Sequence, residues 1–180
     1  MIPRMSCMYP SASKRARRII SLLVAIIALS GSSMLRAATD SADVFATVIA
    51  TLSLVNQTPL SFGEVAPSNT PGTVILNPDG SRLTTGGAFI NSTVAGSSAA
   101  FDGSGLPNAV YAITLPVSVV LTGASGNSMV VDGFTSQPVD TGLTDAGGEQ
   151  NLFVGGTLNV NANQPVGDYR GEMSVTVVYN

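Results

Sequence analysis

The stretch PVGDYRGEMSVTVVYN, residues 165–180, gives the clearest indication of the fold. Apolar side chains stand at every second position in its last part, at Met173, Val175, Val177 and Tyr179. A period of two is that of a β-strand with one buried face, because successive side chains of a strand point to opposite sides. The pattern therefore predicts a strand over 171–179 whose inward face is formed by these four residues.

The chain between residue 44 and this strand has the same character. Short runs rich in Val, Thr, Ile and Phe are separated by clusters of Gly, Asn, Pro and Ser, which favour turns. The further predicted strands are residues 60–65, 73–77, 88–91, 98–101, 110–115, 117–121, 129–134 and 150–160. Nine or ten short strands with a turn signal every 8 to 15 residues predict an all-β fold, a β-sandwich.

Two positions predict local irregularities in these strands. Pro116 divides what would otherwise be one long strand, so we expect an edge or a bend there, since proline has no N–H for the ladder. Gly155 and Gly156 lie inside a strand-like run and predict a β-bulge.

The N-terminus predicts a secretory signal peptide over 1–37. A basic cluster at 14–18 precedes an apolar stretch of 11 residues, 19–29, which small residues follow. A permanent membrane anchor needs about 20 apolar residues, and Arg36 and its small neighbours end the run too early. We therefore expect an exported protein without a permanent membrane span, cleaved after Ala37 or Ala38.

Cleavage there changes the composition. Of the 8 basic residues only Arg82 and Arg170 would remain, against all 11 acidic residues, which gives a formal net charge of −9. Cys7 would leave with the signal, so the exported chain has no thiol for a disulfide. The charged fraction of 11% is too low for a disordered polyelectrolyte or a basic nucleic-acid-binding surface.

The residue types left after cleavage argue against an enzyme. The sequence has no His, and its single Lys and Cys precede residue 37, so the usual bases and nucleophiles are missing. The remaining candidates are carboxylate pairs for sugar hydrolysis, Asp132 with Asp140 and Asp168 with Glu172. We interpret these acids as solubilising loop residues and predict no cofactor and no metal. Calcium at Asp102 with Ser104, or at Asp145 with Glu149, is the alternative.

The run VFATVIATLSLV, residues 44–55, is unusually long for one strand. It would span about 40 Å at about 3.3 Å per residue, about twice a typical strand. We therefore assign 38–51 as an N-terminal extension and candidate donor strand, and 52–180 as the sandwich domain. The donor side chains would be Val44, Ala46, Val48 and Ala50. The alternative is that this run is the domain's own first strand, paired in cis.

Several motifs resemble a known group of exported proteins. A Gly-x-Tyr-x-Gly sequence at 167–171 leads into the last strand, which ends with an aromatic residue one position before Asn180. The other similar stretches are residues 46–54, 60–63, 111–116, 152–160 and 175–180. Together they resemble an exported bacterial domain-of-unknown-function family of pilin-like β-sandwiches, related to the spore coat protein U group and to archaic chaperone–usher (Mat/Ecp-like and Csu-like) major pilins.

The resemblance implies an immunoglobulin-like, pilin-like β-sandwich that lacks one strand. An N-terminal extension from a neighbouring subunit would fill the gap, a periplasmic chaperone would fill it beforehand, and an outer-membrane usher would assemble the subunits. The last strand, with Met173, Val175, Val177 and Tyr179, would then be a C-terminal assembly strand. One departure is that archaic pilins usually carry a disulfide, which this chain cannot form after cleavage.

The sequence thus predicts a structural subunit, exported through the periplasm, that forms a cell-surface fimbria by donor-strand complementation with copies of itself or neighbouring pilins. The alternative is a monomeric secreted or surface-attached adhesin or binding module whose sandwich completes itself. We expect neither an enzyme nor a nucleic-acid-binding protein.

Overall fold

A computed structural model describes residues 39–180, and all its regular elements are β-strands, as predicted. The signal peptide predicted over 1–37 lies outside the described residues. The strands are β1 Ser53–Thr58, β2 Val65–Ala66, β3 Gly72–Leu76, β4 Arg82–Gly86, β5 Phe89–Ile90, β6 Ala99–Ser104, β7 Val110–Thr114, β8 Ser118–Gly123, β9 Ser128–Gln137, β10 Thr141–Leu143, β11 Glu149–Val160, β12 Tyr169–Arg170 and β13 Thr176–Tyr179. Within this part of the chain no helix is long and apolar enough to cross a membrane.

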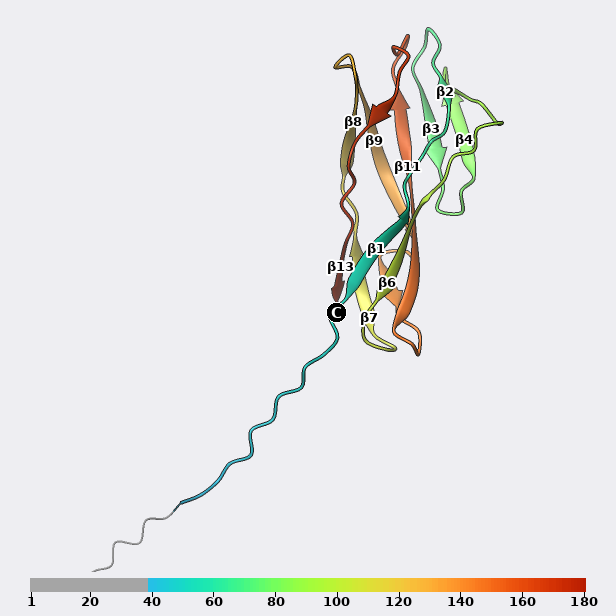
Figure 1. Ribbon diagram of the computed structural model, residues 1–180. Coiled ribbons are helices and arrows are strands. Elements are labelled where there is room, and N and C mark those ends of the chain that lie inside the picture. The colour runs from blue at the N-terminus through green and yellow to red at the C-terminus, as the bar shows by residue number, and fades with distance from the viewer. Residues whose placement is uncertain (1–38) are drawn as a thin grey trace, which may run out of the picture. The chain divides into compact units, whose positions relative to one another are not determined.

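The 12-residue strand β11 organises the larger sheet (Figure 1). One of its edges pairs with β9, and its other edge pairs first with β6 and then with β3. The sheet runs in the order β1-β6-β11-β9-β8-β12, and β4 extends it beyond β3. Leu152, Val154, Leu158 and Val160 of β11 are buried, so the alternation in the sequence marks the face that meets the core.

The predicted bulge in β11 is confirmed at the point where its neighbour changes. The register with β9 shifts between Gly155 and Thr157. A Cβ atom at Gly155 would lie 2.1 Å from the carbonyl oxygen of Leu76, so β3 approaches the backbone there more closely than any side chain allows.

The smaller sheet has the order β10-β7-β13, and a separate short pair joins β2 to β5 (Figure 1). Thr176 of β13 is paired with Thr114 of β7, and Tyr179 with Tyr111. Pro116 lies between the end of β7 and the start of β8, so its predicted breaking role is confirmed. The sheets pack as a sandwich-like arrangement.

Three predicted strands are shorter than expected, and three strands were missed: β4, β10 and β12. The run 44–55 becomes a strand only from Ser53, residues 171–175 belong to no strand, and 60–65 forms only a single bridge and the start of β2. These stretches have the correct alternation but no ladder partner, and a strand requires a partner. Strands β4 and β10 contain too many Thr and Gly residues to stand out, and β12 has only two residues.

Two clusters of buried apolar side chains form the core. The first consists of Phe62, Val74, Leu76, Ala88, Val131, Leu158 and Val160. The second consists of Ala99, Phe101, Tyr111, Ile113, Leu152 and Val154. Leu60 and Phe134 pack against both clusters and join them. The second cluster lies beneath the alternating residues of the C-terminal strand, and the first lies beneath the groove described below.

The bulge yields a test of this architecture. Gly155→Ala is expected to lower the free energy of unfolding by about 1–3 kcal/mol, because its methyl group would overlap the Leu76 carbonyl. Gly147→Ala is the control, since a Cβ there would meet only a carboxylate oxygen of Asp145, at 3.2 Å. Chemical denaturation of both variants measures the difference. Equal free energies of unfolding for the two variants would contradict the close approach.

Candidate functional site

One concave feature of the described residues is a groove of about 610 Å³ with an apolar floor and polar side chains along its walls. Its first wall is the segment 60–67, which follows β1, and its second wall is the segment 164–173, which contains β12. Strands β8, β9 and β11 of the larger sheet form its floor. The groove therefore lies at the margin of the sandwich, above the first core cluster.

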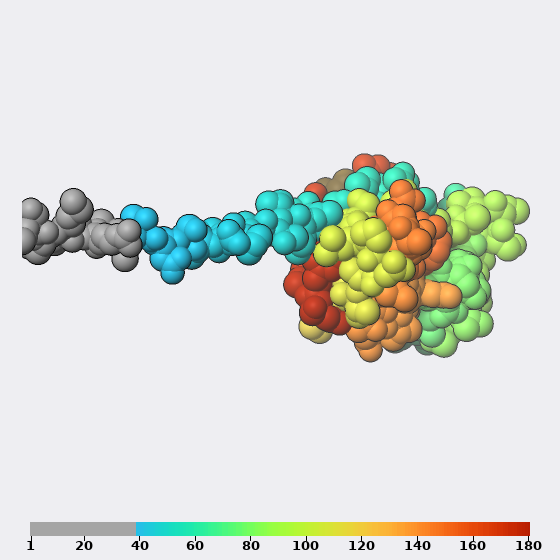
Figure 2. Space-filling view, turned by 90° about the horizontal axis from the view of Figure 1, so that it is seen from below, coloured from blue at the N-terminus to red at the C-terminus, as the bar shows by residue number. Residues whose placement is uncertain are grey.

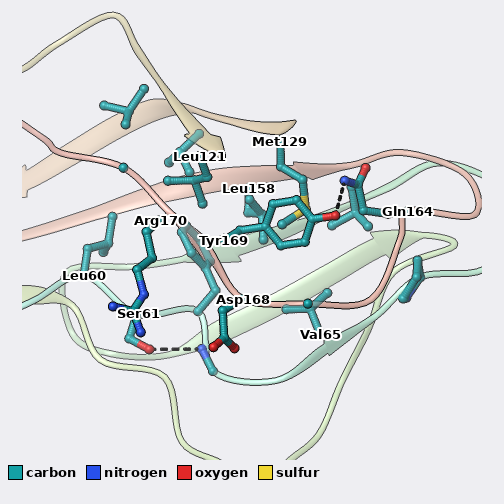
Figure 3. Close-up of a pocket in the computed structure, with 18 of the residues that line it drawn as sticks. Leu60, Ser61, Val65, Leu121, Met129, Leu158, Gln164, Asp168, Tyr169 and Arg170 are labelled. Atoms are coloured by element: carbon teal, nitrogen blue, oxygen red, sulfur yellow. Dashed lines mark hydrogen bonds between the residues drawn. The ribbon is translucent and has the colours of Figure 1, made fainter. Parts of the chain in front are cut away.

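The floor of the groove is apolar because inward-facing positions of three strands meet there. Leu121 of β8, Met129 of β9 and Leu158 of β11 lie side by side beneath it (Figure 3). Val131 and Phe134 complete this surface. Burying such a surface stabilises a protein by about 25 cal/mol for each Å² removed from water.

The second wall carries an unpaired main-chain edge. Strand β13 pairs with β7 along one edge only, and its other edge has no strand partner in the described part of the chain. Residues 171–175 belong to no strand, and no main-chain hydrogen bond joins 172–174 to another described segment. We call this edge, residues 171–179, the open edge. An unpaired edge beside an apolar groove is a template for another strand.

A hydrogen-bonded cluster closes the groove at one end. The Tyr169 hydroxyl donates to the Pro165 carbonyl oxygen at 2.7 Å and accepts from Nε2 of Gln164 at 2.9 Å (Figure 3). Asn161 donates to Oε1 of Gln164 at 2.9 Å. Gln164 is buried, so these bonds satisfy an amide that water does not reach.

The open edge ends at a second tyrosine. The Tyr179 hydroxyl accepts a hydrogen bond from the Leu106 N–H at 2.6 Å and lies 3.4 Å from the Ala50 carbonyl oxygen. Figure 2 shows this end of the domain, where β13 (red) lies beside the yellow-green residues that follow β6. The chain before β1 therefore passes the end of the open edge at Ala50.

Arg82 supports the first wall from behind. Its guanidinium donates from Nη1 to the Phe62 carbonyl oxygen at 2.8 Å and from Nη2 to the Val94 carbonyl oxygen at 3.0 Å. Ser61 forms a two-way main-chain bridge with Ser97, both distances being 2.8 Å. The wall is thus held on the side that faces away from the groove.

A comparison with protein families gives one match for this domain. Residues 52–179 match the family described as a domain of unknown function (DUF4402). The chain belongs to the DUF4402 family. The matched range includes both walls of the groove and all but the last residue of the chain after Thr51. Comparisons with curated proteins and with solved structures found no match.

Within the DUF4402 domain, the four predicted residues of the C-terminal strand lie on the inward face of the segment, as their alternation in the sequence predicts. Met173, Val175, Val177 and Tyr179 are half-buried and pack against the second core cluster, and the residues between them are exposed. Met173 also lines the groove. The sequence pattern therefore located the inward face of this segment, but not the open edge beside it.

The candidate donor residues precede the matched range and lie in no strand. Val44 and Val48 are 92% and 95% exposed, and Ala46 and Ala50 are also exposed. Residues 39–52 contain no regular secondary structure. An alternating apolar stretch is thus left without a partner of its own.

Asp145, one of the residues predicted as a calcium ligand, shapes a turn that also contains its predicted partner Glu149. Among residues 39–180, no group of three or more His, Cys, Asp or Glu side chains is placed to hold a metal ion. The Asp145 carboxylate accepts hydrogen bonds from the N–H groups of Glu149 at 2.9 Å and Gly147 at 2.8 Å. These bonds lower the pKa of Asp145 and use the carboxylate to shape a turn.

The cluster at Tyr169 gives a second test. Tyr169→Phe is expected to lower the free energy of unfolding by about 1–3 kcal/mol, because the buried Gln164 amide loses a partner while the aromatic ring is retained. Thermal or chemical denaturation measures the change. A variant as stable as wild type would show that the cluster does not close the end of the groove.

Proposed function

We propose that this protein is an exported structural subunit of a cell-surface fimbria or pilus-like assembly, and that its copies join by donor-strand complementation. The observation that supports this most is the open edge, residues 171–179, whose first part lines the groove at Gly171 and Met173 above an apolar floor. A strand from a second copy would occupy the groove, pair with the open edge and cover the floor. The protein acts in this account through assembly and carries out no catalysis.

The energetics favour such a complex. Each main-chain hydrogen bond gained along the open edge contributes about 0.5–1.5 kcal/mol, and each buried valine or larger side chain contributes about 1.5–3 kcal/mol. An inserted segment of about seven residues would therefore contribute on the order of 10 kcal/mol, comparable with the stability of a whole domain. Such a joint would need no disulfide, which fits a chain whose only Cys is Cys7.

The donor we propose is the exposed stretch 44–50 of a second copy. Val44, Ala46, Val48 and Ala50 would face the floor, and the side chains between them would face outward. The stretch alternates as a strand requires, and it contains no Gly, Pro, Asn or Asp. Its length of about 23 Å, at about 3.3 Å per residue, matches the length of a typical strand of about 20 Å.

The same composition argues for pairing in trans. The chain passes the end of the open edge at Ala50 and enters β1 at Ser53. To fill its own groove, it would have to reverse direction within residues 50–53. Tight reversals use residues such as Gly and Asn, and ATLS at 50–53 has neither. A second copy places the same stretch in the groove without a reversal.

The predicted route of assembly follows from the resemblance of the sequence to pilin-like families. Export to the periplasm would expose the groove before a second copy arrives, so a periplasmic chaperone would cover it. An outer-membrane usher would then exchange the chaperone for the next subunit, and the final location would be the cell surface.

Deleting residues 39–50 tests the function. The truncated protein is expected to remain monomeric on gels run without heating, whereas wild type forms a ladder of non-covalent multimers. The shortened protein should still join a chain as its last acceptor, because it retains the groove. Monomers alone from the wild-type protein at high concentration would contradict polymerisation, and saturable binding of a glycan by that monomer would support the adhesin alternative.

A pair of substitutions tests which face of the donor enters the groove. Val48→Asp is expected to abolish multimers, since burying an unpaired carboxylate costs far more than a valine contributes. Thr47→Asp carries the same charge on the outward face and should leave the ladder intact. Size-exclusion chromatography measures the oligomeric state of both variants. Loss of multimers only in Thr47→Asp would mean that the opposite face of the donor is inserted.

A further inference from the structure

We propose that Arg82 is a positioning residue that holds the first wall of the groove in the place where an inserted strand can fit. This inference rests on the proposed function, because it concerns how the groove receives a donor strand. It starts from the fact that Arg82 is one of only two basic residues after residue 36.

The contacts of Arg82 connect three segments that are distant in the sequence. Arg82 is the first residue of β4. Its guanidinium donates hydrogen bonds to the carbonyl oxygen of Phe62 at 2.8 Å and to that of Val94 at 3.0 Å. The planar guanidinium carries five N–H donors in a fixed fork, so it can reach two carbonyl oxygens at once. Arg82 thus ties the first wall to the segment behind it and to the edge of the larger sheet.

Two glycines make room for this side chain. A Cβ atom at Gly63 would lie 2.7 Å from Nη1 of Arg82, and one at Gly96 would lie 2.8 Å from its Cδ. Gly63 also has a φ of 72°, a conformation that favours glycine. The close approach on both sides shows that the path of the wall is fitted to the arginine.

The position of the wall bears on the groove because the same segment lines it. Leu60, Phe62 and Val65 face the groove on one side of the segment, and the Arg82 bonds lie on its other side. Strand pairing on this wall is weak, since its only ladder contacts are the Ser61–Ser97 bridge and the two-residue strand β2. The packing of Leu60 and Phe62 on the core and the bond from the Asn91 N–H to the Glu64 carbonyl oxygen at 3.0 Å also hold the segment, and the guanidinium fixes its main chain at Phe62.

Binding of a labelled synthetic peptide with the sequence of residues 39–51 measures the effect. The acceptor is full-length protein in which Val48→Asp blocks self-assembly. In this background, Arg82→Met is expected to weaken peptide binding by about tenfold or more, because the two charge-assisted hydrogen bonds that connect the wall at Phe62 to Val94 are lost. Arg82→Lys keeps the charge but cannot bridge both carbonyl oxygens, so its affinity for the peptide should fall between those of the acceptor with Arg82 and of Arg82→Met.

Thr85→Val is the matched control on the same hairpin. It removes the 2.6 Å hydrogen bond between the hydroxyls of Thr73 and Thr85 without touching the wall, so peptide affinity should stay near wild type. Equal weakening of peptide binding by Thr85→Val and Arg82→Met would overturn the inference. Peptide binding by Arg82→Lys that is as tight as that of the acceptor with Arg82 would also overturn it. This second outcome decides the question even if Arg82→Met fails to fold. If the acceptor with Arg82 intact binds no peptide, the proposed function itself fails.

Discussion

The structure depends on one constraint: main-chain N–H and C=O groups at the edge of a sheet need partners, and the open edge, residues 171–179, has no strand partner in the described part of the chain. Strands β1, β4 and β10 also have one unpaired side, but the segment that leads into β13 differs from them because its residues Gly171 and Met173 line the groove. Natural β-proteins usually protect such an edge with charges, bulges or a covering loop. Here Glu172 is the one charged residue of the open edge, and its inward positions are apolar, which suits a strand that arrives from elsewhere.

The rest of the fold keeps that edge open. Strand β11 holds β6 and β3 along one side, and the bulge at Gly155 lets β3 come close at the point where the two meet. Tyr169 fixes the second wall through Gln164, and Tyr179 fixes the end of the open edge through Leu106. Arg82 holds the first wall from outside. A groove with fixed walls loses less conformational entropy when a strand enters than a collapsed one would.

The sequence was sufficient to predict the all-β class, the break at Pro116, the bulge in β11 and the inward face of the C-terminal segment. These features depend on local alternation and on the special backbone properties of Pro and Gly. It was not sufficient to show that residues 171–175 lack a partner, because alternation reports which side of a segment is buried and not what lies along its edge. The bonds of Arg82 were also beyond prediction, since Phe62 and Val94 are brought to it only by the tertiary fold.

Hydrogen exchange of the main-chain amides of residues 171–175 tests the central claim most directly, because exchange reports pairing without any assumption about register. The measurement compares the protein as a monomer with the same protein in multimers. Our account predicts fast exchange at these amides in the monomer and strong protection in the multimers, with the amides of β11 protected in both. Equal exchange rates at 171–175 in the two forms would contradict it.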